Sequence, residues 1–438
     1  MSTYCLKAEE IPMNDSYDVL IVGGGPAGCA AAIAAARHGA KVLLIEAQTY
    51  LGGMSTGGMV PTWCPFSDGE RSVYEGIARE IFDLSNAALR VPKTSKFNWV
   101  QIDPEALKII YDELLEKAGV DVLFSTFICQ TDAENGHVDA VIAANKAGLT
   151  AYKAKIYIDA TGDGDVAAFA GARFIEGDGD GHVQAATHCF ELAGVNEEEY
   201  KKLRLHGGNA DSPIYTIVKD KNHPLIDDTH ICQSLVKPQT VGFNAGHLWN
   251  VHVDDVAGAS KALSAGRKKA AAYLAALKDY EPAAFENAYV SETASMLGIR
   301  ESRRVLGDYV LSTEDYLARQ SFPDEIGRNC YYLDLHLTKE EVASGMKCES
   351  HRYGKGESHG IPYRVLTPVG FDNLLVAGRC ISSDRAVNGS VRVMPVCLVT
   401  GQAAGTAAAM AAMGGLDVHT IDVDALRSKL REDGAYFL

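Results

Sequence analysis

Residues 17–28 read YDVLIVGGGPAG, and this stretch decides the fold. Its first six residues form a short apolar run that is typical of a strand buried on both faces of a parallel sheet. A glycine run follows at once, and the alanine-rich segment that continues through Arg37 predicts a helix. A second apolar run, 42–45, ends at Glu46. Strand, glycine loop, helix, strand and acid within about 30 residues predict a dinucleotide-binding unit.

Each part of this unit has a physical role. Gly23 permits the tight turn, Gly25 leaves room for a diphosphate beside the backbone, and Gly28 lets helix and strand pack closely. The helix start offers unpaired N–H groups to the phosphates. Glu46 accepts hydrogen bonds from ribose hydroxyls and repels a 2′-phosphate, which disfavours NADP. A glycine-rich turn in an ordinary α/β sheet is the alternative. The predicted binding residues are Gly23, Gly25, Pro26, Ala27, Gly28, Glu46 and Ala47.

A second glycine cluster, LGGMSTGGM at 51–59, follows Glu46 closely. A unit that binds only NAD would normally continue into another helix and strand, so a second close backbone approach favours a flavin ring. A flexible surface loop is the alternative interpretation. The residues assigned to the cofactor here are Gly52, Gly53, Met54 and Ser55.

The next hundred residues predict one helix and several strands. Asp103, Pro104 and Gly119 mark the two ends of a helix. Strands are predicted at 122–124, 138–143 and 150–152, the last two in an antiparallel meander, and at 155–159. The motif ATGDGD at 160–165 then places small residues at the carboxyl end of a strand, where ligands of open α/β sheets bind. It supplies Thr161, Gly162 and Asp163 as cofactor residues.

The C-terminal part contains a further strand and a long helix. The apolar run 373–377 predicts a buried strand that ends at Gly378 and Arg379, and both of these residues are candidates for the cofactor site. Pro395 predicts the first turn of an alanine-rich helix that extends to about residue 413. Arg392 lies just before this helix, so its guanidinium is a further candidate for the cofactor site.

Four blocks together resemble a known family: 22–28, 51–56, 159–165 and 360–405. They resemble the FAD-dependent oxidoreductases of the glutathione-reductase-like two-domain flavoprotein fold, which are distantly related to the succinate dehydrogenase and fumarate reductase flavoproteins. The resemblance implies bound FAD. It also implies that the start of the last long helix, at Val393 and Met394, faces the flavin ring.

The implied architecture is α/β, with a Rossmann FAD-binding domain that combines a parallel sheet with an antiparallel β-meander. An α+β substrate domain is inserted into it. The expected boundaries are 16–171 and 365–438 for the two parts of the FAD-binding domain and 172–364 for the substrate or cap domain.

Candidate catalytic residues are those that bind an anion or move a proton. Arginine presents a planar fork to carboxylate or phosphate, and histidine titrates near neutral pH. Structural pairing is the alternative for each of them. The principal candidates are His359, Arg303, Arg300, Tyr363 and Arg364, and His188, His247 and His252 are further candidates on residue type alone.

Composition narrows the functional classes. The 438 residues carry a net charge of −16, which disfavours nucleic acid as a partner. The N-terminus has no apolar secretory region, and no apolar run reaches membrane-span length, so a cytoplasmic protein is expected. The ten cysteines form no C-x-x-C pair, and no metal site is expected.

The sequence therefore predicts an FAD-dependent oxidoreductase that transfers hydride between flavin and a small polar or anionic organic substrate. An NAD(P)H-dependent flavin monooxygenase and a non-catalytic flavoprotein subunit of a redox complex are the alternatives. Only one dinucleotide loop is present, so an external electron carrier is left open as a partner, as is self-association.

Overall fold

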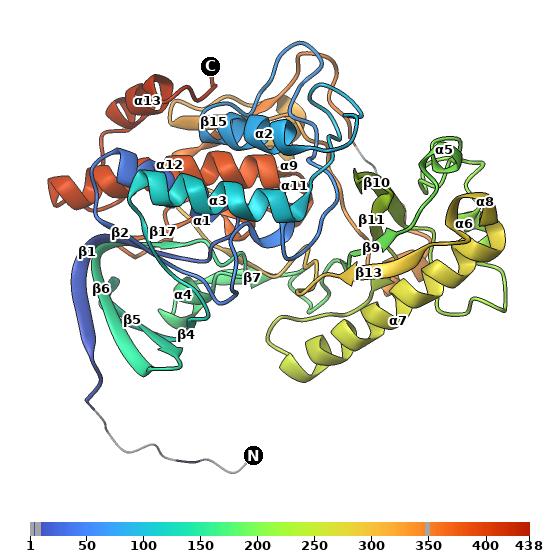
Figure 1. The fold of residues 1–438 in the computed structure, drawn as a ribbon. Coiled ribbons are helices and arrows are strands. Elements are labelled where there is room, and N and C mark those ends of the chain that lie inside the picture. Colours follow the sequence, from blue (N-terminus) through green and yellow to red (C-terminus); the bar gives the residue numbers. More distant parts are fainter. Residues whose placement is uncertain (1–3, 5–9, 347–350) are drawn as a thin grey trace.

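The computed structural model describes Tyr4, residues 10–346 and residues 351–438, and Figure 1 shows their arrangement. The chain enters the sheet with β1 (Met13–Val22), continues into α1 (Pro26–Arg37) and returns in β2 (Val42–Ile45). β1 and β2 pair in parallel, with Val19 opposite Val42. The predicted strand–loop–helix–strand unit is therefore confirmed.

This unit belongs to a seven-stranded sheet with the order β3-β2-β1-β6-β5-β4, in which β17 also pairs with β6. The parallel strands β3, β2, β1, β6 and β17 form one part, and β4, β5 and the beginning of β6 form an antiparallel meander. The bounds of the added strands are β3 (Asp121–Leu123), β4 (Phe127–Glu134), β5 (His137–Asn145), β6 (Gly148–Asp159) and β17 (Leu374–Val376). The fold is thus α/β, with a Rossmann-like domain on a largely parallel sheet.

One strand differs from the prediction. The segments 150–152 and 155–159 were expected as separate strands, but both lie in β6. The first part of β6 pairs with β5 and the last part pairs with β17, while β1 runs along its other edge. The strand is continuous because it exchanges one neighbour for another along its length.

The helices α1 and α12 (Met394–Gly414) pack closely against one another over the sheet (Figure 1). A Cβ atom at Gly401 would lie 2.1 Å from the carbonyl oxygen of Ala27, and one at Gly405 would lie 2.1 Å from that of Ala31. Only glycine fits at these two positions. α12 is also long and apolar enough to cross a membrane, which corrects the expectation that no segment is, but 89% of its most apolar window is buried inside the protein.

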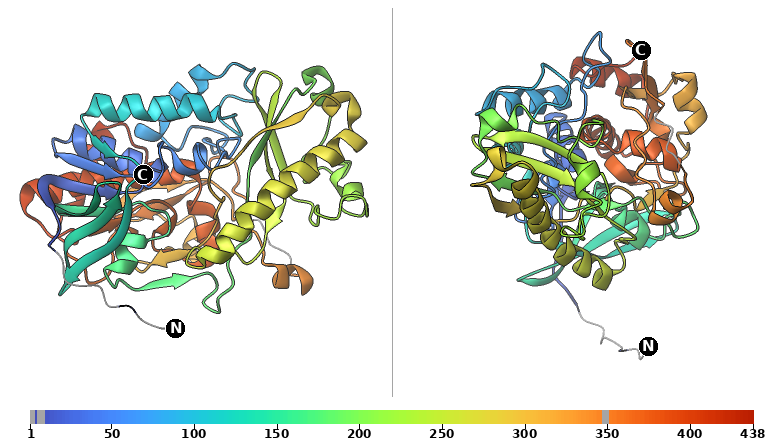
Figure 2. Two further views of the ribbon diagram at one scale, coloured as in Figure 1. Left: turned by 60° about the horizontal axis from the view of Figure 1, so that its bottom comes forward. Right: turned by 90° about the vertical axis from the view of Figure 1, so that its right-hand side faces the viewer.

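A second unit lies at the opposite end of the molecule from the meander (Figures 1 and 2). Its four-stranded antiparallel sheet has the order β10-β11-β9-β13 and packs against the long helix α7 (Val256–Tyr280). A separate hydrophobic core, with Phe190, Phe243 and Tyr273 near its centre, holds the unit together. The four strands are β9 (Phe190–Ala193), β10 (Ile231–Lys237), β11 (Thr240–Ala245) and β13 (Tyr289–Thr293).

The larger core belongs to the main sheet and includes residues on both sides of this unit. Val305, Leu311 and Tyr316 pack into it, although they precede the expected boundary at residue 364. The buried contacts therefore favour an inserted unit smaller than 172–364.

The remaining elements are short or lie at the periphery. The helices are α2 (Ile77–Ala88), α3 (Pro104–Ala118), α4 (Asp165–Phe169), α5 (Glu197–Tyr200), α6 (Ile214–Ile217), α8 (Pro282–Phe285), α9 (Thr313–Ala318), α10 (Lys339–Ala343), α11 (Arg385–Val391) and α13 (Val423–Glu432). The strands pair in twos: β7 (Phe174–Glu176) with β14 (Arg303–Val305), β8 (Ala186–Thr187) with β12 (His247–Leu248), and β15 (Glu325–Asn329) with β16 (His359–Pro362).

Candidate functional site

The glycine loop before α1 has the geometry that a dinucleotide requires. Gly23 adopts a φ of +97°, and a Cβ there would lie 2.5 Å from the carbonyl oxygen of Ala160. A Cβ at Gly28 would lie 1.7 Å from the carbonyl oxygen of Gly23. Gly25 differs, because a Cβ there meets no atom within 4 Å. It is the N-cap of α1 and, as a glycine, gives no side-chain hydrogen bond to the first amides of the helix.

The second glycine cluster packs against this loop. The amide of Gly52 donates to the carbonyl oxygen of Gly24 at 2.8 Å, and a Cβ at Gly53 would lie 3.0 Å from the Cα of Gly25. The short 3-10 turn Gly53–Ser55 follows. The structure therefore brings together the two glycine clusters that the sequence assigned to one ligand.

Glu46 lies at the end of β2, as predicted, but its carboxylate contacts the protein itself. Oε2 accepts a hydrogen bond from the Gly24 amide at 2.5 Å, and Oε1 accepts one from the Gln48 amide at 2.7 Å. Burial raises the pKa of Glu46, although these hydrogen bonds oppose the shift. The side chain of Glu46 thus orients the glycine loop. Ala47 is the next residue along the chain.

The loop that follows β6 lies against the glycine loop that precedes α1, as the contact between Gly23 and Ala160 shows. The buried carboxylate of Asp159 accepts hydrogen bonds from the Thr161 hydroxyl at 2.7 Å and from the Ala167 amide at 2.9 Å, which shapes the turn. Asp163 accepts a hydrogen bond from Arg379 Nη2 at 2.7 Å. A Cβ at Gly162 would lie 2.9 Å from the same Nη2 atom. Distant motifs of the sequence therefore meet here.

The start of α12 completes the arrangement. Gly378 lies against Ala27 of α1, since a Cβ at Gly378 would be 2.9 Å from the Ala27 Cβ. Val393 caps α12 and Met394 opens it, without a side-chain capping hydrogen bond. Just before them, Arg392 Nη2 donates to the carbonyl oxygen of Asp334 at 2.9 Å.

Two buried guanidinium nitrogens without hydrogen-bond partners indicate the kind of ligand that this site would bind. Arg379 Nη1 and Arg392 Nε are both buried and lack a hydrogen-bond partner among the described residues. Unpaired buried guanidinium nitrogens are costly unless an acceptor joins them. Together with the open space at Gly25, they fit a ligand that carries phosphate and carbonyl oxygens, as a flavin dinucleotide does.

Arg300 is buried in the second unit. Its Nη1 donates to the carbonyl oxygen of Ala185 at 2.7 Å and to the Thr187 hydroxyl at 2.6 Å. Its Nη2 donates to Asn244 Oδ1 at 3.3 Å and contacts His230 Nε2 at 3.2 Å. Burial lowers the pKa of Arg300 to about 10, and the nearby charge of Arg392 contributes. The guanidinium therefore remains protonated at neutral pH.

A cluster of three histidines lies beside Arg300: His230, His247 and His336, hereafter the histidine cluster. The rings of His230 and His247 stack at 4.6 Å, and the His336 ring lies edge-on to both. Burial lowers the pKa of all three, that of His336 to about 3, and neighbouring positive charges add to the shift.

Two carboxylates accompany this cluster. Burial by itself would raise the pKa of Asp228 and of Asp334, but the nearby side chains of His247 and His336 lower the pKa of Asp228 and of Asp334, respectively, below the usual range. Only His247 of the cluster was a sequence candidate. His230 and His336 are 106 positions apart in a chain without a spacing motif, so no local signal identifies them.

The other catalytic candidates pair with protein groups elsewhere. Arg303 binds Asp165 at 2.8 Å and the carbonyl oxygen of Asp163 at 3.3 Å, so it supports the loop after β6. Burial, together with the acids nearby, raises the pKa of Asp165 to about 6. Arg364 binds Asp324 at 2.9 Å.

Tyr363 and His359 are held inside the fold. The Tyr363 hydroxyl donates to the carbonyl oxygen of Val418 at 2.8 Å. His359 is fully buried, contacts the Tyr353 hydroxyl through Nδ1, and has its pKa lowered to about 3 by burial. Within the described part of the chain, neither residue hydrogen-bonds to Arg300 or to the histidine cluster, so the structure does not bring the five catalytic candidates into one site. Their catalytic roles remain predictions.

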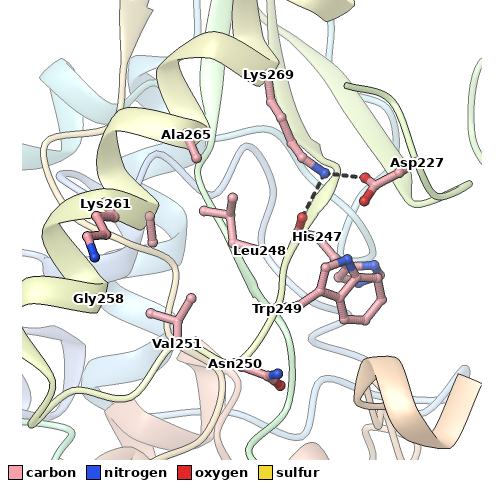
Figure 3. A pocket seen from close by; sticks show the side chains of 11 residues that line it. Asp227, His247, Leu248, Trp249, Asn250, Val251, Gly258, Lys261, Ala265 and Lys269 are labelled. Atoms are coloured by element: carbon pink, nitrogen blue, oxygen red, sulfur yellow. Dashed lines mark hydrogen bonds and ion pairs between the residues drawn. The ribbon is translucent and has the colours of Figure 1, made fainter. Parts of the chain in front are cut away.

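A cavity of about 320 Å³ lies next to the cluster, between α7 and the segment that follows β12 (Figure 3). His247 and Trp249 line one side of it, and Lys261 and Lys269 come from α7. Lys269 donates to the carbonyl oxygen of His247 at 2.8 Å and pairs with Asp227. The cavity therefore has both aromatic and cationic walls.

Comparison with known proteins identifies a family whose model covers most of the chain. The family model described as FAD dependent oxidoreductase matches residues 18–430. A vinyl phenol reductase of Lactiplantibacillus plantarum is 57% identical over 42 residues, which are 10% of this chain and 8% of that protein. Digeranylgeranylglycerophospholipid reductase 1 of Methanopyrus kandleri is 30% identical over 156 residues, 33% of this chain and 40% of that protein. The matches thus span less than half the length of these relatives.

Among solved structures, a geranylgeranyl bacteriochlorophyll reductase-like protein from Thermoplasma acidophilum aligns over 98% of this chain and 93% of that chain. The two are 13% identical, with a TM-score of 0.48.

Proposed function

Because the chain belongs to the FAD dependent oxidoreductase family, it is an FAD-dependent enzyme, and we propose that it transfers hydride between FAD and a small polar or anionic organic substrate. The observation that carries the substrate class is the buried, charged Arg300, whose charge lies near that of Arg392. Arginine binds carboxylate and phosphate through a planar fork of donors.

For the cofactor, we assign the diphosphate to the start of α1. The open space at Gly25 and the uncapped helix end support this assignment. Arg379 and the start of α12, with Val393 and Met394, are assigned to the flavin end. When bound, FAD supplies the acceptor or donor of hydride.

The protein's own groups have separate tasks in this proposal. Ala185 and Thr187 hold Nη1 of Arg300, so that its fork keeps one orientation. Asp163 holds Arg379 through Nη2 and leaves Nη1 free for the cofactor. Burial excludes water from the Arg300 side chain and from Nη1 of Arg379, which strengthens their attraction for an anion.

We propose further that the domain arrangement is of the glutathione-reductase type, with the unit around β9–β13 and α7 covering the substrate. Two features support this domain arrangement. The main sheet carries an antiparallel meander, and the unit around β9–β13 and α7 has a hydrophobic core of its own. Electrons then pass through one active site or to an external carrier.

The proposal is tested by mixing the FAD-loaded protein anaerobically with a panel of carboxylate and neutral substrates. The absorbance of the bound FAD then reports its reduction or reoxidation by each substrate. We expect carboxylates to react and Arg300→Met to raise the substrate KM at least tenfold while FAD stays bound. Arg364→Met is the matched control, because Arg364 is paired with Asp324. The proposal would be contradicted if neutral analogues reacted as well as carboxylates, with no difference between the two variants. Oxygen-dependent hydroxylation with NAD(P)H would contradict it as well.

A further inference from the structure

The histidine cluster joins two parts of the molecule. His230 directly precedes β10 and His247 opens β12 in the second unit, whereas His336 lies between β15 and α10. Each histidine has a ring nitrogen within 4.8 Å of a ring nitrogen of the other two. Three imidazoles from separate segments thus converge on one point.

Carboxylates lie behind two of the three rings. His247 Nδ1 is 3.3 Å from Asp228 Oδ1, and His336 Nε2 is 3.7 Å from Asp334 Oδ1. The opposite nitrogens of these rings, His247 Nε2 and His336 Nδ1, face each other at 2.8 Å. A carboxylate behind a histidine whose other nitrogen points at a shared centre is the usual outer shell of a protein metal site.

The tautomers of the two facing rings decide whether a proton or a metal ion lies between them. A nitrogen that faces a carboxylate carries the proton, because two lone pairs would otherwise repel each other. His247 Nε2 and His336 Nδ1 are then both lone-pair acceptors, and they face each other at 2.8 Å. A positive ion between them removes this repulsion.

We propose that His230, His247 and His336 bind one divalent transition-metal ion of the Zn²⁺ class. Imidazole nitrogen suits Zn²⁺ and its neighbours in the first transition series, whereas Mg²⁺ and Ca²⁺ prefer oxygen. Zn–N bonds of about 2.0–2.1 Å at tetrahedral angles place two nitrogens about 3.3 Å apart. The facing rings of His247 and His336 would open by about half an ångström.

His230 is available as the third ligand. Its Nε2 contacts Arg300 Nη2 at 3.2 Å and Asn244 Oδ1 at 3.3 Å. Arg300 Nη2 also donates to Asn244, and Arg300 Nη1 has two further acceptors, so neither group depends on His230 alone. Arg300 therefore keeps its hydrogen bonds when the imidazole of His230 turns to the ion.

Three protein ligands leave one tetrahedral position open. Asp228 and Asp334 offset the charge of the ion, and Arg300 and Arg392 then favour an anion in the open position. The cavity that His247 lines provides space beside the cluster (Figure 3). This last step rests on the proposed anionic substrate, whereas metal binding itself does not.

The test measures zinc in the FAD-loaded protein without substrate. The full chain is freed of metal with a chelator, dialysed against Zn²⁺, and analysed for zinc and FAD by elemental analysis and absorbance. Competition with a chromogenic chelator then gives the affinity. We expect one zinc per chain, an affinity at least 100-fold lower in His336→Gln, and one about tenfold lower in Asp334→Asn, which removes only the supporting carboxylate.

His252→Gln is the matched control, because His252 belongs to a second, more exposed group with Glu176 and Asp254. Its zinc content should equal that of the wild type. Absence of stoichiometric zinc in the wild type would overturn the proposal in favour of a proton shared by His247 and His336. Unchanged affinity in His336→Gln, or loss in His252→Gln, would overturn it too. FAD content distinguishes this failure from a failure of the cofactor site, and Asp334→Asn serves if His336→Gln does not fold.

Discussion

The glycine loop before α1 and the histidine cluster are assembled in different ways. The loop and its flanking acid come from residues 23–55, a single strand–helix–strand unit with its following turn. The histidine cluster and its partners come from segments scattered between Asp228 and Arg392. A site made from neighbouring residues leaves a pattern in the sequence, whereas a site made by the tertiary fold leaves only its residue types.

Gly25→Val is the substitution that we expect to change the glycine loop's binding of FAD most strongly. A Cβ at Gly25 meets nothing within 4 Å, so the fold should tolerate valine, while the side chain enters the space assigned to the diphosphate. We expect FAD affinity to fall at least 100-fold, about 2.7 kcal/mol, with little change in the Tm of the FAD-free protein. FAD absorbance after gel filtration measures the loss.

Gly28→Val is the matched control for that experiment. Its Cβ would lie 1.7 Å from the carbonyl oxygen of Gly23, so this variant should lose the fold together with the cofactor. Full FAD retention in Gly25→Val would show that the diphosphate lies elsewhere.

The difference between the two regions also explains what the sequence could predict. β1, α1, β2 and α3 match their predictions because glycine, proline and capping residues mark their ends, as Asp103 does by accepting from the first amides of α3. The continuity of β6 was missed, because it depends on an exchange of neighbours from β5 to β17. Local propensity carries no information about such pairing.

The same reasoning applies to the candidate site. Gly52, Thr161 and Arg379 were assigned to the cofactor from motifs, and the structure gathers their segments around the loop. His230 and His336 were missed, since a single histidine has no periodicity or spacing that separates a site residue from a core residue. Arg364 shows the converse, because a residue of the right type pairs with Asp324 instead.

A second prediction concerns the packing that holds the loop in place. Gly405→Val puts a side chain 2.1 Å from the carbonyl oxygen of Ala31, and overpacking of this kind costs about 1–3 kcal/mol or more. We expect a clear fall in Tm and weaker FAD binding, because α1 shifts with α12. Met413→Ala, at a position that is 66% exposed in the same helix, should leave both unchanged. Equal thermal stability of the two variants would disprove close packing of α1 and α12.

A third prediction, with a smaller effect, concerns the role of Glu46 in orienting the glycine loop. Glu46→Gln keeps the size of the side chain but replaces one acceptor oxygen, which weakens the hydrogen bonds to Gly24 and Gln48. We expect FAD affinity to fall about tenfold, or 1.4 kcal/mol, by fluorescence titration. Glu80→Gln, which removes only the exposed pair with Arg37, is the control. An equal loss in both variants would exclude a specific role for Glu46.

The smallest effect lies away from both sites, at His419. Burial lowers the pKa of this imidazole, but the hydrogen bond to Asp308 and the contact with the Phe371 carbonyl oxygen outweigh it, so the pKa is raised overall. The stability that the charged pair contributes is therefore fully present below pH about 6.5 and is lost as the pH rises through the folded-state pKa.

We expect His419→Gln to flatten the pH dependence of the unfolding free energy between pH about 6 and 8, by less than about 1 kcal/mol, since the pair is partly exposed and screened. Denaturant titrations at several pH values measure this change. Asp308→Asn should flatten the curve by the same amount, because either substitution removes the pair. If the wild-type slope persists in both variants, another titrating group produces it. The titrating group would then be sought among the charged and hydrogen-bonded residues of the glycine loop and the histidine cluster.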